Sequence, residues 1–311
     1  MRFAMVALMS RSRLLLVFAL LSATSSRADA RAHGGWQRAT ELARGLGPKK
    51  PKSVALRLLP PAIRARVIRG GIEVKETALE GVVVRLASST DDLVASARLV
   101  HDTYVRRGIM QPERSGLRVT EQLAHPSTAV FLATRHEIPI GTISLALDSP
   151  HGLPMEKIYP DEIGTLRRAG RSVAEVGALA LAVGERGQGI VHLLNKAMLE
   201  HGRERKVDDL VISVHPDAED LYRASLLFQR MGPVKSYPGL ERSALAAPLR
   251  LDLRTAKARF YEAYRGTRGF DAHQFYMVDG RPELHIAMSA SYETARAAAG
   301  AGLLARQRAA Q

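Results

Sequence analysis

One carboxylate lies inside an otherwise apolar stretch of the sequence: Glu175, within the run 173–179. Burying a carboxylate is costly unless the group is paired or takes part in chemistry. Desolvation also raises the pKa of a carboxyl group, which suits it to accept a proton from an amine. Gly177 follows shortly after, where a bulge would free backbone N–H groups to bind an oxyanion. A structural ion pair, or a position facing water at a sheet edge, is the alternative interpretation of Glu175.

A second candidate is the glycine-containing turn Arg186-Gly187-Gln188-Gly189-Ile190. Glycines between a strand and a helix let backbone N–H groups converge, and the helix that opens there presents further free N–H groups to a phosphate. Arg186 adds a positive charge that pairs with phosphate directly. The spacing lacks the third glycine of a dinucleotide-binding motif and the Lys-Ser/Thr of a P-loop. An ordinary glycine-rich turn is an equally good interpretation of these residues alone.

The elements that position these groups follow from the apolar pattern, which becomes regular from residue 78. Strands are expected at 82–87, 128–134, 140–147, 173–183, 210–214 and 244–253, with the second and third joined by a turn over 137–139. Helices are expected at 91–108, 116–125, 160–169, 188–205 and 218–231, and an alanine-rich helix near the C-terminus. The order predicts an α/β (α+β) protein with a mixed central sheet and helices on both faces.

Composition and charge restrict the class of protein. The balance of 46% hydrophobic and 24% charged residues is typical of a globular chain. The net charge of +14 is concentrated at one end, because residues 1–77 hold 15 Lys and Arg against 4 Asp and Glu. This favours a basic arm that contacts an anionic membrane surface over a folded nucleic-acid-binding face. The lack of cysteine excludes disulfides and a cysteine nucleophile, and no histidine spacing predicts a metal site.

The turn at 186–190 resembles the donor-binding motif of the GNAT acyltransferases, Q/R-x-x-G-x-G/A, with Arg186 first and Gly189 fourth. Val191 departs from the final small residue, which favours a donor with a single phosphate over a pyrophosphate. Tyr222 lies where a GNAT tyrosine often protonates the departing thiolate. A packed core tyrosine is the alternative interpretation.

Four further segments resemble a narrower family, the FeeM-type N-acyl amino acid synthases, which are GNAT-fold relatives of the homoserine-lactone autoinducer synthases. They are YVRRGIM from Tyr104, SGLR ending at Arg118, DSPHGLPM at 148–155 and AEV around Glu175. The resemblance covers residues 80–255, and DSPHGLPM is its most specific part. It implies a GNAT fold and transfer of a long-chain acyl group from acyl carrier protein to the amine of an amino acid. Gly177 departs from the serine that family members often carry.

The resemblance implies roles for individual residues, without a covalent intermediate or a permanently bound cofactor. The co-substrate would be acyl-phosphopantetheine on the carrier protein, or acyl-CoA. Glu175 would accept the amine proton and Tyr222 would protonate the thiolate. The acceptor would be bound by Tyr104, Arg114 and Arg118, of which the two arginines could bind its carboxylate in a bidentate way. A solvated basic loop is an equally good interpretation of Arg114 and Arg118. The donor would contact Leu181, Val183, Arg186, Gly187, Gln188, Gly189 and Ile190, and the insertion 148–171 would wall an acyl channel through Leu153, Met155 and Ile158.

The N-terminal region is at odds with this chemistry. Residues 1–30 resemble a secretory leader, with an apolar run at 14–23 and a small-x-small site at Ala28-Asp29-Ala30. The run is too short to span a bilayer, which takes about 20 apolar residues. Acyl thioesters are cytoplasmic metabolites, so an early start codon or an uncleaved anchor is preferred to export. The expected organisation is this segment, a basic linker at 31–77, the acyltransferase domain at 78–255 and a C-terminal extension at 256–311.

Two alternatives to the synthase remain open from the sequence. One is an N-acetyltransferase of the GNAT type that uses acetyl-CoA, which differs in the length of the acyl group. The other is an exported GNAT-like binding protein without catalytic activity, for which the leader-like segment at 1–30 is the argument.

Overall fold

A mixed β-sheet organises the part of the chain that the computed structural model describes, which is residues 56, 58–187, 189–237, 245–267, 269–279 and 290–310. The described strands are β1 (Val82–Leu86), β2 (Thr128–Arg135), β3 (Ile138–Leu147), β4 (Val173–Leu181), β5 (Asp209–Val214), β6 (Gln229–Arg230), β7 (Lys235–Ser236) and β8 (Leu245–Asp252). Their order is β1-β2-β3-β4-β5-β8-β6, and β7 also pairs with β8. Only β4 and β5 are parallel among these pairs. The predicted mixed α/β architecture is confirmed.

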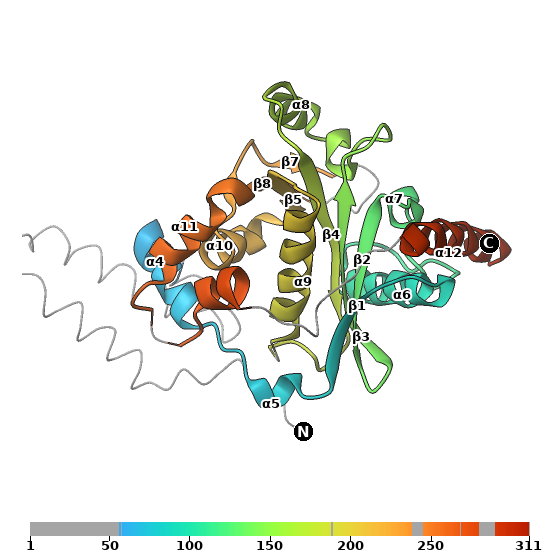
Figure 1. The fold of residues 1–311 in the computed structure, drawn as a ribbon, viewed down its shortest axis with the longest axis horizontal. Coiled ribbons are helices and arrows are strands. Elements are labelled where there is room, and N and C mark those ends of the chain that lie inside the picture. Colours follow the sequence, from blue (N-terminus) through green and yellow to red (C-terminus); the bar gives the residue numbers. More distant parts are fainter. Residues whose placement is uncertain are drawn as a thin grey trace, which may run out of the picture. The chain divides into compact units, whose positions relative to one another are not determined.

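Helices cover both faces of this sheet (Figure 1). One face carries α9 (Ile190–Glu204), α10 (Pro216–Ser225), α11 (Leu253–Tyr264) and the π-helical turn η2 (Gln274–Val278). The opposite face carries α6 (Thr90–Arg106), α7 (Glu121–Ala124) and α12 (Ala290–Ala309). The insertion between β3 and β4 forms a 3-10 turn, η1 (Pro154–Lys157), and α8 (Pro160–Arg168).

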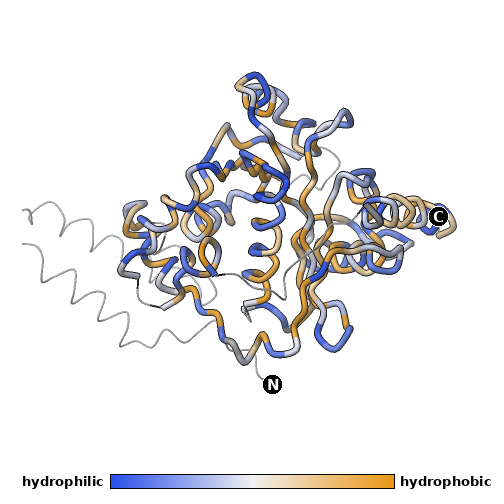
Figure 2. Tube along the Cα trace, viewed as in Figure 1, coloured by the Kyte–Doolittle hydropathy of each residue, from blue (hydrophilic) through white to orange (hydrophobic). Residues whose placement is uncertain are grey.

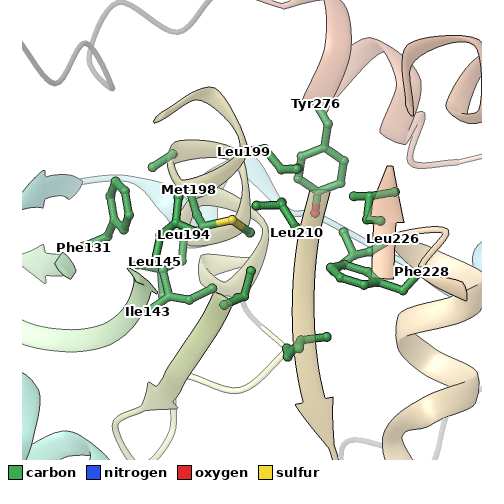
Figure 3. Packing of buried hydrophobic residues seen from close by; sticks show 14 of the residues in the cluster. Phe131, Ile143, Leu145, Leu194, Met198, Leu199, Leu210, Leu226, Phe228 and Tyr276 are labelled. Atoms are coloured by element: carbon green, nitrogen blue, oxygen red, sulfur yellow. The ribbon is translucent and has the colours of Figure 1, made fainter. Parts of the chain in front are cut away.

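The largest apolar cluster lies under α9, whose apolar residues recur at helical spacing. Figure 3 shows Leu194 and Met198 of α9 close to Ile143 and Leu145 of β3, all of them buried. Each such side chain contributes about 2 kcal/mol by leaving water. Hydrophobic residues follow the strands, whereas the turn between β2 and β3 is hydrophilic (Figure 2). The sheet and α9 therefore form a rigid support for the residues at their edges.

The predicted hairpin is present, but its turn differs from the prediction. The turn consists of His136 and Glu137, with φ of 50° and 62°, and not of residues 137–139. Two consecutive residues with positive φ are typical of the tight turns that match strand twist. Pro139 consequently lies inside β3, where the β2–β3 register shifts.

Two predicted helices are shorter than expected. Of the stretch 116–125, only α7 is helical, because Gly116 has a φ of 64° and the N–H of Arg118 donates to the carbonyl of Ala97 at 3.1 Å. Of the stretch 218–231, the helix ends at Ser225, Leu227 has a φ of 59°, and residues 229–230 pair with β8. Tertiary pairing overrides local helix preference at both positions.

The N-terminal predictions fall largely outside the described residues, which include neither 1–55 nor Arg57. The chain divides into two units, residues 1–64 and 65–311, and the sheet lies in the second. Within the predicted linker, α4 (Pro61–Gly70) is helical, and α5 (Glu76–Leu79) crosses the end of the linker at residue 77. Of the described helices, none has the length and apolar character needed to cross a membrane.

Candidate active site

The two parallel strands at the centre of the sheet separate part of the way along their length. β4 pairs with β5 at Val173, Ala174 and Glu175, opposite 209–211. No pairing between them is present among the described residues beyond Glu175, although β4 continues to Leu181 and β5 to Val214. The strands therefore part at Glu175 and leave an opening between them.

The opening coincides with a bulge in β4. The β3–β4 register shifts between Thr142, which faces Ala180, and Ser144, which faces Gly177. Ala178 has a φ of 51°, a left-handed conformation that costs a residue with a Cβ roughly 1–2 kcal/mol. The bulge predicted beside Gly177 is confirmed, and strain of this kind is typical of functional sites.

A cavity of about 250 Å³ lies at this opening. Glu175, Gly177 and Ala178 line it from β4, and Ser213 and His215 line it from the end of β5. The other side is formed by α6, α7 and the segment between them, and the cavity also reaches Tyr237. The remaining lining residues are Val100, Tyr104, Ile109, Arg118, Thr120, Gln122, Leu123, Thr128, Ser144, Ala146, Pro154, Val176, Val214, Leu245 and Ala246.

Glu175 is the buried carboxylate of this cavity, with 7% of its surface exposed. Its Oε2 accepts a hydrogen bond from the backbone N–H of Met155 at 2.7 Å. The pKa of Glu175 is raised to about 8, chiefly by burial; the hydrogen bond from Met155 acts in the opposite direction, and the negative charge of Glu156 contributes a smaller rise. β4 is a central strand and Glu175 makes no ion pair with the described residues, so neither alternative interpretation of this carboxylate fits.

The insertion 148–155 positions the N–H of Met155. Gly152 takes a φ of 72°, and Pro154 starts η1. Arg167 of α8 bridges the segment, because it binds Asp148 at 2.7 Å and Glu156 at 2.5 Å. These ion pairs join η1 to α8 and to Asp148 at the end of β3. The segment contacts Glu175 of β4 through the backbone N–H of Met155.

The acyl-channel candidates of the insertion do not line this cavity. Leu153 and Met155 are buried in a separate apolar cluster with Tyr159 and Ile163, and Ile158 packs against that cluster. Pro154 is the residue of this segment that faces the cavity.

Arg118 and Tyr104 join Glu175 in the cavity, although they come from different parts of the chain. The guanidinium carbon of Arg118 lies 5.2 Å from the centre of the Tyr104 ring, which is within the range of a cation–π interaction. Arg114 is exposed and is not among the lining residues. Of the two candidate carboxylate ligands, the structure therefore places only Arg118 in the cavity.

Tyr237 is a cavity residue that sequence reasoning missed. The pKa of Tyr237 is raised to about 12, chiefly by burial; the nearby charge of Glu175 acts in the same direction and Arg118 in the opposite one. It packs against the apolar cluster of the insertion. No local motif surrounds it in the sequence, so only the fold brings it to Glu175.

The predicted donor turn begins where β4 ends. Gly184, Gly187 and Gly189 have φ of 91°, 76° and 88°, which side chains with a Cβ rarely adopt. Gly189 precedes α9, whose first residue is Ile190, and no side chain caps this helix. Free N–H groups at such an end suit a phosphate. Gln188 lies outside the described residues.

Residues of the neighbouring strands β2 and β3 hold this turn in place. The N–H of Ala182, just after Leu181, donates to the carbonyl of Ile140 at 2.8 Å. Arg135 of β2 pairs with Glu185 at 2.7 Å. Val183 is 79% exposed, so its backbone lies at the surface.

Arg186 belongs to a group of arginines at this turn. The positive charge of Arg107, at the end of α6, lowers the pKa of Arg186 most; its own burial and then the charge of Arg106 act in the same direction. Mutual repulsion of this kind is relieved when an anion binds among the three guanidinium groups.

Tyr222 lies on α10, outside the cavity lining. Its ring packs edge-on against Phe228, with centroids 6.1 Å apart. The pKa of Tyr222 is raised to about 12, chiefly by burial; Tyr104 acts in the same direction and Arg107 in the opposite one. Tyr222 is therefore electrostatically coupled both to a cavity residue and to the arginine group, and it holds its proton at neutral pH.

The comparisons with known proteins point to one family. The family model described as N-acyl amino acid synthase FeeM matches residues 95–252. The structure of FeeM, an N-acyl amino acid synthase from uncultured soil microbes, is 29% identical, covers 57% of this chain and 93% of its own, and has a TM-score of 0.51.

More remote structural matches are synthases of acyl-homoserine lactones. LasI is 15% identical, covering 64% of this chain and 98% of its own with a TM-score of 0.44. The CoA-dependent BjaI is 16% identical, covering 61% and 92% with a TM-score of 0.43. No curated protein sequence matches.

Proposed function

The chain belongs to the FeeM family of N-acyl amino acid synthases, whose model spans half of it, and we propose that this acyltransferase moves a long-chain acyl group from acyl carrier protein to an amino acid amine. The observation that carries the proposal is the position of Glu175. A carboxyl group with a raised pKa lies in a cavity at the point where β4 and β5 part, opposite Arg118.

The acceptor would bind with its carboxylate on Arg118 and its amine near Glu175. A guanidinium group offers two parallel N–H donors to a carboxylate. Tyr104 supports Arg118 through its ring face. Because Arg118 and Glu175 line the same cavity, one small molecule can reach both groups.

The ionised form of Glu175 would remove a proton from the amine as nitrogen attacks the thioester carbonyl. A C–N bond forms, and the carbonyl oxygen becomes an oxyanion that backbone N–H groups at the Gly177–Ala178 bulge would stabilise. The C–S bond then breaks, and the thiolate takes the proton of Tyr222. Glu175 then releases its proton to solvent and Tyr222 regains one from solvent, so the amine loses one proton and the thiol gains one overall.

The donor's phosphopantetheine arm would enter from the opposite edge of the opening. Its amide groups would pair with the backbone of Leu181 and Val183, beyond the pairing of β4 with β5. Its phosphate would lie on the N–H groups of the segment 187–190 and beside Arg186. A single phosphate agrees with Val191, which replaces a small residue at the end of the turn.

The proposal is tested by supplying the full chain with pooled amino acids and with two sets of donors, which are acyl carrier protein thioesters and the matching acyl-CoAs. Each set runs from about two to about sixteen acyl carbons, so that turnover can be compared across donor type and length. Mass spectrometry should detect N-acyl amino acids, formed fastest from long-chain carrier-protein donors. Turnover with acetyl-CoA but not with long-chain donors would instead identify an N-acetyltransferase.

A further inference from the structure

The C-terminal helix α12 lies beyond the residues that match the family model, yet it packs on the cavity side of the sheet. Its Arg296 is the largest fully buried side chain of the described chain, with 0% exposure. Arginine is almost never buried without a partner, because its charge cannot be removed by deprotonation. Arg296 therefore needs a specific structural reason.

The guanidinium of Arg296 binds three backbone carbonyl groups. Nε donates to Thr128 at 3.2 Å and Nη1 to Ala124 at 3.4 Å, and Nη2 donates to Leu123. These carbonyls belong to α7 and to the first residue of β2. One rigid side chain thus ties the end of α7 to the start of β2 and closes the turn between them.

This turn forms part of the cavity wall. Gln122, Leu123 and Thr128 line the cavity, and Gln122 Nε2 donates to Thr128 Oγ1 at 3.4 Å. Arg296 contacts the carbonyls of two of these lining residues, Leu123 and Thr128.

Side chains of α12 support the neighbouring segment that carries Arg118. Ala299 and Leu303 belong to the same apolar cluster as Leu117 and Leu123. Leu117 directly precedes Arg118, so a displacement of this cluster would move the proposed carboxylate ligand.

We propose that Arg296 is a positioning residue for the acceptor: it holds the α7–β2 turn and, with α12, the Arg118 segment in the geometry that binds the amino acid. This inference rests on the proposed function, in which the amino acid is the acyl acceptor. Arg296 itself does not line the cavity and does not contact the reacting atoms.

Gly300 gives an independent way to disturb the same contact. A Cβ at Gly300 would collide with the carbonyl oxygen of Ala124, so α12 and α7 approach each other backbone to backbone. Alanine is the better helix former by about 1 kcal/mol, so Gly300→Ala favours α12 itself while it pushes α7 away.

The test uses Arg296→Lys and Gly300→Ala in the full chain, with two matched controls on α12. Arg306→Met removes an exposed arginine that pairs with Asp91 at 2.6 Å. Arg308→Met changes a second exposed arginine near the end of α12, which does not line the cavity.

Both test variants should raise KM for the amino acid by about tenfold or more, while kcat and KM for the acyl donor stay within about twofold. Amide hydrogen exchange over residues 121–128 should accelerate in both variants. Neither control should change these quantities.

A merely structural role predicts lower thermal stability with both KM values unchanged, and that result would overturn the proposal. So would unchanged exchange at 121–128, which is measured without any activity. If the parent chain forms no N-acyl amino acid at all, the proposed function fails, whereas the exchange result still decides whether Arg296 holds the turn.

Discussion

The backbone N–H of Met155 donates to Oε2 of Glu175 at 2.7 Å, and this bond joins the insertion to the buried carboxylate of β4. The bond lowers the pKa of Glu175, against the larger effect of burial, which brings it to about 8. The insertion therefore influences how readily Glu175 ionises through one of its backbone N–H groups.

The first prediction concerns pH. Because only the ionised form of Glu175 accepts a proton, kcat/KM should rise with pH through an apparent pKa near 8. The profile is measured with a saturating donor and limiting amino acid, and with a homologous acceptor of different amine pKa. If the apparent pKa of this profile shifted with the pKa of the acceptor amine, the assignment to Glu175 would be contradicted.

The free energy of unfolding should fall with rising pH because of Glu175, whereas kcat/KM rises. The pKa of Glu175 is raised from its ordinary 4.5 to about 8 in the folded chain. The unfolded chain therefore releases this proton first, so Glu175 costs stability progressively as pH rises from 4.5 to 8. Denaturant titrations should show that the free energy of unfolding of Glu175→Gln rises relative to that of the parent chain as pH increases over this interval. A constant difference in the free energy of unfolding between the two proteins would refute the raised pKa.

A third prediction separates the insertion from the catalytic group. Arg167→Met removes the bridge between Asp148 and Glu156, which frees η1 and weakens the bond from Met155. The pKa of Glu175 should then rise, and the pH limb of kcat/KM should move to higher pH. Arg168→Met is the matched control, because Arg168 is exposed on the same helix. A limb that stays in place in both variants would disprove the coupling.

Arg118 and Arg114 provide a test residue and a control residue for binding of the acceptor carboxylate. Arg118 lines the cavity and Arg114 does not. Arg118→Met should raise KM for the amino acid by roughly 10- to 100-fold, as expected for a lost charged hydrogen bond, and Arg114→Met should leave it unchanged. For the corresponding amine that lacks a carboxylate, KM should be the same in Arg118→Met as in the parent chain. An equal loss with both acceptors would remove Arg118 from carboxylate binding.

The donor turn gives a fifth prediction. Arg186 lies beside Arg106 and Arg107, so Arg186→Met should raise KM for the acyl donor by about fivefold and weaken its dependence on salt. Arg98→Met, an exposed change elsewhere on α6, serves as the control. A changed KM for the amino acid, with the donor unaffected, would place the phosphate elsewhere.

The sequence anticipates those parts of the molecule that depend on local pattern. Apolar periodicity predicts the strands around Glu175 and the helix after Gly189, and the GNAT fold implied by the resemblance is confirmed by the similarity to FeeM. Three features depend on distant contacts and leave no local signal. They are the end of α10 at Ser225, the approach of Tyr237 to Glu175, and the buried Arg296.

The position of Arg296 shows why such features escape prediction. In the sequence it is one arginine in an alanine-rich segment, where a solvent-facing position would be ordinary. Its partners Leu123, Ala124 and Thr128 lie more than a hundred residues away in the chain. Only the docking of α12 on the sheet face turns a surface residue type into a buried donor.

The most direct measurement of the central claim compares Glu175→Gln with the parent chain in acyl transfer to an amino acid. Glutamine keeps the shape of the side chain and an oxygen that can accept the N–H of Met155, but it cannot take a proton. The account predicts a fall in kcat of about 10²- to 10⁴-fold, with KM for donor and acceptor nearly unchanged. A variant that turns over at the parent rate would contradict the role of Glu175 as the base.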